Sequence, residues 1–266
     1  MPSILPSREP SGVKVPAVGA LFWVVKLITT GLGESTGDFL ATVNLLLTAA
    51  VGLIGFVVAM RRQLRAPRYE TWTYWTAVLM VAVFGTLSAD GLHILFKVPY
   101  AAATTFFAAV LAVVFVQWRR SEGTLSIHSI TTARRERFYW LAVLTTFALG
   151  TAVGDLTATT LHLGFLPSAL LFAAAITVPA LGWWRFGWNP VASFWAAYVL
   201  TRPLGASLAD WFGKKHSFGH GLGLGDGPVT AVGLVLFVAL VAYFAASGAD
   251  RQPHPSVHVE AAPVHP

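Results

Sequence analysis

The chain of 266 residues contains no cysteine, so it forms no disulfide and offers no thiolate to a metal. Its methionines, Met1, Met60 and Met80, are too few and too scattered to form a thioether site for a soft metal. Charged residues are scarce at 11%, whereas 55% are hydrophobic, a balance that does not fit a soluble domain of this size. The composition predicts an integral membrane protein, in which any metal would be bound by oxygen or imidazole.

Catalytic sequence motifs are missing as well. The chain contains no nucleophile elbow, no Walker motif and no HExxH pair. The stretch GHGLGLGDG at 219–227 superficially suggests a phosphate loop, but it follows no strand and lacks the Lys-Ser/Thr ending. We therefore expect no enzyme and no cofactor, and an intramembrane enzyme is the function class with the least support.

Apolar stretches of about 20 residues are long enough to cross roughly 30 Å of hydrocarbon as helices. Eight of them lie at about 15–35, 39–60, 70–90, 98–118, 137–161, 165–184, 190–212 and 228–247. The fifth is long enough to be tilted or to break near Gly154. This pattern predicts an all-α polytopic membrane protein with one eight-helix domain over 15–247, a cytoplasmic polar arm at 1–14 and a disordered cytoplasmic tail at 248–266.

The basic residues lie almost entirely on one side of this predicted topology. That side holds Arg8, Lys14, Arg61, Arg62, Arg65, Arg68, Arg119, Arg120, Arg134, Arg135, Arg137, Arg185 and Arg251. The other side holds Lys97, Lys214 and Lys215. By the positive-inside rule both termini are cytoplasmic. The net charge of +6 is therefore a topology signal, and nucleic acid is not an expected partner.

An internal repeat covers the odd-numbered apolar stretches. Its four copies read FWVVKLITTGLGESTGD (22–38), YWTAVLMVAVFGTLSAD (74–90), YWLAVLTTFALGTAVGD (139–155) and FWAAYVLTRPLGASLAD (194–210). All four share an aromatic residue, a tryptophan, a glycine ten residues after the tryptophan, and an aspartate five residues after the glycine. Each two-helix repeat, at about 15–65, 66–125, 131–187 and 188–247, enters the membrane in the same direction. The copies are expected to be related by a pseudo-fourfold or pseudo-twofold axis normal to the bilayer.

These residues resemble a known family. KLITTGLGESTGDF, TLSIHSI with the following RRERFYWLAVL, FALGTAVGD and YVLTRPLGASLAD are similar to bacterial inner-membrane proteins built from four tandem two-helix "repeats of unknown function", each with a characteristic tryptophan. The resemblance extends from about Val15 to Leu240. It implies the location and the repeat architecture but no particular activity.

The shared positions of the repeat have a simple physical interpretation. The tryptophan begins each odd helix, where an amphipathic ring suits the level of the lipid headgroups, so we expect an interface anchor. The aspartate follows 15 residues later, which is roughly 22 Å deeper along a helix. The glycine and the Gly or Ala four residues after it form a small-xxx-small face that allows close helix packing. We therefore expect the odd helices to line the centre of the molecule and the uniformly apolar even helices to lie at its periphery. If the odd helices pack through this face, the four aspartates converge as a ring or as two facing pairs.

Three ionisable residues occur in one copy only. Copy one adds Lys26 and Glu34, and copy four adds Arg202. At the position of Glu34 the other copies have Thr86, Thr151 and Ala206, none of which ionises. Counted with the four aspartates, five acids face two bases, so the membrane interior is predicted to carry a formal charge of −3.

The leading hypothesis is a secondary transporter or exporter of a small cation, a metal ion or one coupled to protons. Its pathway residues are Lys26, Glu34, Asp38, Asp90, Asp155, Arg202 and Asp210. Glu34 and Asp38 lie on adjacent turns of one helix face and are the candidate metal ligands. Lys26 would be an internal counter-ion that competes with the cation, and Arg202 a gating partner for an acid. Because no acid of its own copy lies close enough to either base, we expect both to pair across repeats, in one polar network with Glu34 and Asp38.

Two alternatives from other classes remain. The chain could transport an organic or anionic solute bound at Lys26 and Arg202, or it could be a membrane scaffold or sensor without flux, in which SIHSI and RRER recruit a cytoplasmic partner. Membrane lipid and a small cation or proton are the expected partners. The sequence leaves open whether the chain forms a homo-oligomer.

Overall fold

The computed structural model describes residues 12–252, and within them the chain is entirely helical apart from turns and links. Its eight long helices are α1 (Ala20–Val43), α2 (Leu45–Arg65), α3 (Thr71–Phe96), α4 (Tyr100–Glu122), α5 (Ala133–Asp155), α6 (Phe165–Phe186), α7 (Pro190–Gly213) and α8 (Asp226–Ser247). A 3-10 turn, η1 (Ile127–Ser129), precedes α5, and a π-helical turn, η2 (Leu156–Thr160), follows it. Six helices, all except α1 and α7, are long and apolar enough to cross a membrane. By this measure the chain is a multi-pass membrane protein.

The sequence prediction was least accurate for α1, which was expected at 15–35 and extends from Ala20 to Val43. Glu34 and Asp38 lower the hydropathy of this stretch, so the apolar run ends before the helix does. Hydropathy measures the suitability of a segment for lipid, whereas the middle of α1 is buried against protein, where polar side chains find partners. The helix ends at Val43, and the side chain of the following Asn44 accepts a hydrogen bond from the Leu47 amide and thereby caps α2.

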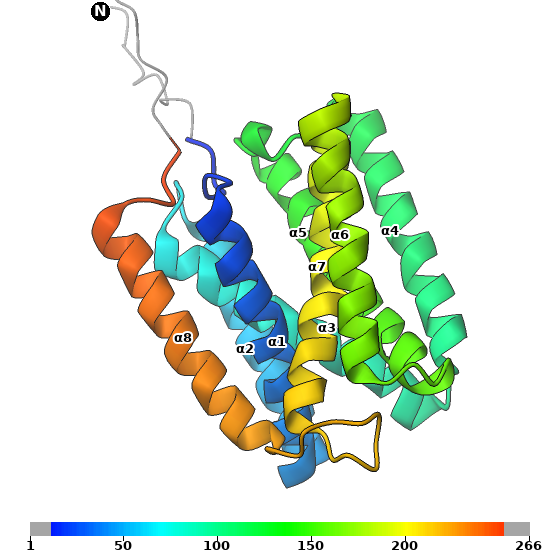
Figure 1. Ribbon diagram of the computed structural model, residues 1–266. Helices are drawn as coiled ribbons and strands as arrows, with labels where there is room; N and C mark the ends of the chain where they lie inside the picture. The colour runs from blue at the N-terminus through cyan, green and yellow to red at the C-terminus, as the bar shows by residue number, and fades with distance from the viewer. Residues whose placement is uncertain (1–11, 253–266) are drawn as a thin grey trace, which may run out of the picture.

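The odd-numbered helices form the centre of the molecule and the even-numbered helices form its periphery, as the sequence predicted (Figure 1). The central helices close a ring in which α1 packs on α3 and α7, and α5 packs on the same two helices. Each even helix packs mainly on the odd helix that follows it: α2 on α3, α4 on α5, α6 on α7, and α8 on α1. The last contact closes the circle between the two ends of the chain.

The repeated glycine allows the central helices to approach each other closely. In each copy this glycine packs against a residue of the next copy, and the four partner residues occupy the same position in the repeat alignment. These pairs are Gly33 with Ala82, Gly85 with Phe147, Gly150 with Arg202, and Gly205 with Thr30. At all four, an added Cβ would come closer to the neighbour than real Cβ atoms come. The small-residue face predicted from the sequence is therefore the packing face of the ring.

This contact gives a first testable prediction. Gly33→Ala should lower the thermal unfolding temperature of the protein in detergent, at a cost of about 1–3 kcal/mol, because the new methyl group would overlap both the side chain and the backbone of Ala82. Gly91→Ala in α3 is the matched control, because nothing lies within 4 Å of the added Cβ. There the helix propensity of alanine should leave stability unchanged or slightly raised. Equal effects of the two substitutions would contradict close packing at Gly33.

Aromatic side chains close one end of the ring, which we call the aromatic end (top in Figure 1). The first aromatic residue of each repeat contacts the tryptophan of the next copy, with ring centroids 5.5–6.1 Å apart. The pairs are Phe22 with Trp75, Tyr74 with Trp140, Tyr139 with Trp195, and Phe194 with Trp23. Trp75, Trp140 and Trp195 are buried, so the prediction that these tryptophans anchor the protein at the membrane interface was wrong. Their aromatic faces interlock the repeats instead.

Both terminal segments of the described chain pack on the aromatic end. Lys14 is buried in an ion pair with Glu136, 2.6 Å between Nζ and Oε2, although the sequence placed it in a polar arm. The Asp250 carboxylate accepts a hydrogen bond from Tyr69, and its backbone oxygen accepts one from Ala17. Residues 248–252 thus belong to the fold and not to a tail. The rest of the predicted arm and tail, 1–11 and 253–266, lies outside the described residues.

Burial and the neighbouring Asp250 carboxylate raise the pKa of Tyr69 well above its usual range. The phenol therefore stays protonated and keeps its donor role at any physiological pH. This contact fixes the link between α2 and α3 to the end of α8.

Candidate ion site at the centre of the helix ring

The centre of the ring contains a fully buried ion pair between α1 and α7. Arg202 Nη2 lies 2.6 Å from Glu34 Oε2, and both side chains are almost completely inaccessible. These residues are 168 positions apart and belong to the first and last copies, which the ring brings into contact. The expected connection of Glu34 with Arg202 is confirmed.

Two threonines complete this pair. Thr86 and Thr151 occupy the repeat position of Glu34 in copies two and three, and each donates to Glu34 Oε2, over 3.0 and 3.2 Å respectively. Arg202 Nη2 lies 2.6 Å from each threonine oxygen. We call Glu34, Thr86, Thr151 and Arg202 the central cluster. Sequence reasoning discounted the threonines because they do not ionise, although the repeat alignment already placed them level with Glu34.

Lys26 does not join the central cluster. Within residues 12–252 its amine has no hydrogen-bond partner. It lies on two aromatic faces, 3.8 Å from the ring centroid of Tyr198 and 4.7 Å from that of Phe147. The ring of Phe147 also forms a cation–π contact with Arg202, whose Cζ lies 5.3 Å from the ring centroid. Cation–π attraction thus replaces the carboxylate that the sequence led us to expect beside Lys26. Arg202 Nε and Nη1 also lack partners among the described residues.

Three carboxylates gather on the side of the central cluster away from the aromatic end. One oxygen from each of Glu34, Asp38 and Asp210 lies within 4.8 Å of the other two. The first two are contributed by α1 and the third by α7. We call them the carboxylate triad. Asp210 is buried and, among residues 12–252, forms no ion pair.

Asp38 also binds Lys214, the residue that follows α7. The Lys214 amine is 2.8 Å from Asp38 and 3.3 Å from Asp226 at the start of α8. The sequence placed Lys214 in an outer loop and gave it no part in the site. Its position follows from tertiary structure, because the link between α7 and α8 turns back over the triad.

Asp90 and Asp155 form a second acidic group on α3 and α5. They interact electrostatically with each other, and Tyr100 of α4 faces Asp155. Neither forms an ion pair within the described chain. Two of the four repeated aspartates thus belong to the carboxylate triad, and the other two interact electrostatically with Glu34 and Asp38 as well as with each other. Six carboxylates, counting Asp226, face three basic side chains, Lys26, Arg202 and Lys214, which leaves the formal charge at −3.

The sequence of each two-helix unit identifies the family. Residues 21–69, 73–124, 138–187 and 193–250 each match the family described as "Repeat of Unknown Function (DUF347)". The chain belongs to this family. No curated protein and no solved structure matches it significantly.

The four DUF347 repeats build the ring from equivalent positions, and the central cluster is where they differ. The shared glycine and tryptophan make the same contact from copy to copy, whereas Glu34 and Arg202 each occur once. A repeated scaffold thus contains one asymmetric polar site.

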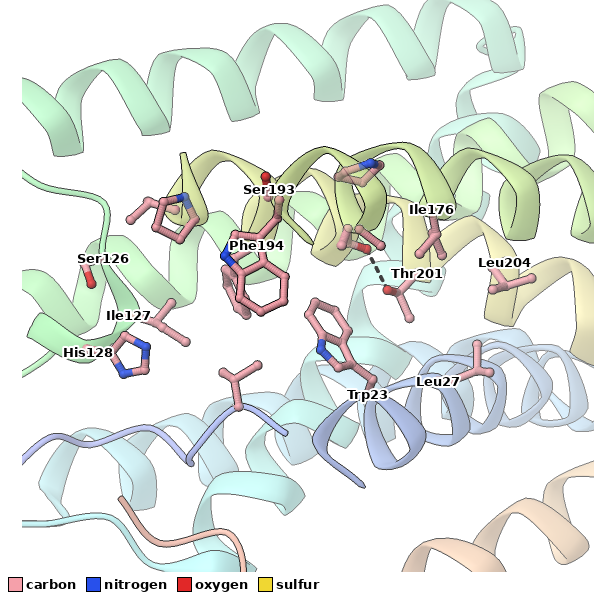
Figure 2. Close-up of a pocket in the computed structure, with 17 residues that line it drawn as sticks. Trp23, Leu27, Ser126, Ile127, His128, Ile176, Ser193, Phe194, Thr201 and Leu204 are labelled. Carbon is pink, nitrogen blue, oxygen red and sulfur yellow. Dashed lines mark hydrogen bonds between the residues drawn. The ribbon is translucent and has the colours of Figure 1, made fainter. Parts of the chain in front are cut away.

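A cavity of about 650 Å³ lies outside the ring centre, between α1, α6, α7 and η1 (Figure 2). Trp23 and Leu27 line it from α1, Phe194 and Thr201 from α7, and His128 from the 3-10 turn. Thr201 is the neighbour of Arg202 in the chain, but its hydroxyl bonds the Ala197 carbonyl, as the dashed line in Figure 2 shows. The lining is mostly apolar and includes no residue of the central cluster or triad. We therefore assign this cavity no part in ion binding.

Proposed function

We propose that the protein is a secondary transporter or exporter of a small cation, and that the carboxylate triad is its binding site. The observation that carries this proposal is the approach of three carboxylate oxygens within 4.8 Å of one another inside a ring of helices. Oxygen ligands of this kind suit hard cations such as Mg²⁺, Ca²⁺ and Mn²⁺. The excess of carboxylates over basic groups gives a positive substrate a favourable field.

Proton coupling follows from competition for Glu34. In the described conformation its carboxylate is neutralised by Arg202 and accepts two threonine hydrogen bonds. A cation that binds the triad must share Glu34 with Arg202, and a proton on a triad carboxylate removes one ligand charge. Cation and proton therefore exclude each other at the same oxygens, the condition for exchange across a membrane.

The proposal includes a topology. All eight helices cross the membrane, with α1 and α7 shielded from lipid by their neighbours, and the four repeats are related by a pseudo-fourfold axis. The cyclic glycine and tryptophan contacts support this symmetry. The proposal puts the aromatic end and both termini in the cytoplasm of a bacterial cell, with the protein in the inner membrane. The concentration of arginines at the aromatic end supports this orientation. The interlocked aromatic residues close the pathway on that side.

Flux in reconstituted vesicles tests this function. Vesicles that contain the protein and an internal pH dye should change their internal pH when a gradient of a transported cation is applied, and protein-free vesicles should not. A panel of monovalent and divalent cations identifies the substrate class. If no member of the panel moves and no pH change occurs, the transporter proposal is wrong, and a scaffold or sensor becomes the better interpretation.

A second candidate is transport of an anionic or organic solute at Lys26 and Arg202. Three buried nitrogens that have no hydrogen-bond partner in the described part of the chain favour it: Lys26 Nζ, Arg202 Nε and Arg202 Nη1. Under this alternative, Lys26→Met should abolish flux of a tested anion such as chloride. Under the cation proposal no anion flux exists to abolish, so the same panel with anions separates the two functions.

A further inference from the structure

We infer that Lys214 is a tethered cation that occupies the outer approach to the carboxylate triad and is displaced when the substrate cation binds. This inference rests on the proposed function, because it assigns a regulatory role at the same site. Under this inference Lys214 competes with the substrate cation and is more than a permanent ion-pair partner that stabilises the fold.

The position of the amine is the first observation. Lys214 Nζ lies 2.8 Å from the oxygen of Asp38, a member of the triad, and 3.3 Å from Asp226. It also interacts electrostatically with Asp210, a second member of the triad. The ammonium group thus satisfies the same carboxylates that a bound cation would need. One positive charge beside Asp38 reduces the affinity of the triad for another.

The balance of charge around the amine is the second observation. Two carboxylates, Asp38 and Asp226, lie within 3.3 Å of one ammonium group, so this place keeps a negative excess. A second cation is therefore attracted to it and competes with Lys214 for the oxygen of Asp38.

The attachment of Lys214 is the third observation. Its backbone is fixed, because its amide donates to Asp210 and its carbonyl accepts from Gly223. Two further hydrogen bonds, from Leu222 to Trp211 and from Leu224 to Phe212, hold the link against the end of α7. The side chain is 23% exposed and can turn toward solvent without disturbing these bonds. The backbone keeps the amine near the triad while the flexible side chain lets it leave.

Lys215 provides the matched control. It adjoins Lys214 and carries the same charge, but it is exposed and forms no ion pair within the described residues. Substitution of either lysine removes one positive charge from the same surface. A general electrostatic effect would therefore be similar for the two variants, whereas a competitive role belongs to Lys214 alone.

The test is Mn²⁺ binding to the purified full-length protein in lipid nanodiscs, measured by electron paramagnetic resonance. Lys214→Met should bind Mn²⁺ about fivefold to tenfold more tightly than wild type. In wild type, Mn²⁺ must break a partly exposed ion pair worth about 1 kcal/mol or slightly more, and this cost is absent from the variant. Lys215→Met should bind like wild type. Lys214→Arg keeps a competing charge and should also remain close to wild type. Thermal unfolding of each variant shows that the fold is retained.

The outcomes separate this inference from the proposed function. Saturable Mn²⁺ binding that is unchanged or weakened in Lys214→Met overturns the displacement role and leaves the cation site in place. Equal tightening in Lys214→Met and Lys215→Met also overturns it, because the effect would then be general. Absence of binding and of cation flux in wild type and in all variants overturns the proposed function, and this inference with it.

Discussion

Arg202→Met should destabilise the folded protein by about 3–5 kcal/mol, because it leaves Glu34 buried without its cation. Methionine is close to arginine in shape near the backbone, so the contact of this side chain with Gly150 changes little. The acidic excess strengthens the effect, since loss of a positive charge moves the ring interior further from neutrality. The measurement is the thermal unfolding temperature in detergent, with Arg185→Met as control. Arg185 is exposed in the last turn of α6.

The double variant Arg202→Met, Glu34→Leu distinguishes an unpaired charge from lost packing. If charge is the cause, removal of both partners should restore most of the lost stability. The threonines tolerate this change, because Thr86 and Thr151 also bond the backbone oxygens of Ala82 and Phe147. A double variant as unstable as Arg202→Met would show that the packing of the arginine side chain is what matters.

The architecture was predictable because the small residues that allow the helices to pack closely recur in every copy of the repeat. A glycine at the same position in four copies identified the packing face, and its restriction to odd helices placed those helices at the centre. The length of α1 was mispredicted, since hydropathy assumes lipid as the surroundings of a helix. The tryptophans were misassigned for a related reason: interface anchor and interlocking aromatic residue have the same sequence pattern, and only tertiary contacts separate them.

The candidate site was predictable where charge signalled it. Glu34 and Arg202 stood out as single ionisable residues in otherwise apolar helices, and they pair. Lys214 lay beyond prediction, because its approach to Asp38 depends on how the link after α7 folds back. Lys26 was expected near a carboxylate, but the aromatic rings that receive it come from the third and fourth copies. No spacing rule within one copy reveals such contacts.

The parts of the site follow one another along the ring. Aromatic residues close one end, the central cluster lies in the middle, and the carboxylate triad with Lys214 lies toward the other end. Under the proposed function, a cation that reaches the triad would meet two internal competitors, first Lys214 and then Arg202. Arg202 lies within α7, whereas Lys214 follows the end of this helix, so a cation could displace one without the other.

Glu34→Gln should reduce proton-coupled cation flux to the level of protein-free vesicles while the protein remains folded. Glutamine keeps an oxygen that can accept from Arg202, Thr86 and Thr151, but it removes the charge that cation and proton exchange. The fold should survive better than in Arg202→Met, because loss of one acid moves the acidic interior toward neutrality, whereas loss of one base moves it further away. The measurement is cation-driven pH change in vesicles, with size-exclusion chromatography and thermal unfolding as checks on folding.

Asp90→Asn is the comparison that gives the Glu34 result its meaning. Asp90 is one of the repeated aspartates, lies in the group formed with Asp155, and is outside the carboxylate triad. It contributes to the acidic field but shares no ligand position with Glu34, so its loss should reduce flux only in part. Normal flux with unchanged pH dependence in Glu34→Gln would show that the coupling role is wrong and that Glu34 serves to neutralise Arg202. Complete loss in both variants would instead assign the exchange to the whole acidic end of the ring, because no single carboxylate would then differ from the others.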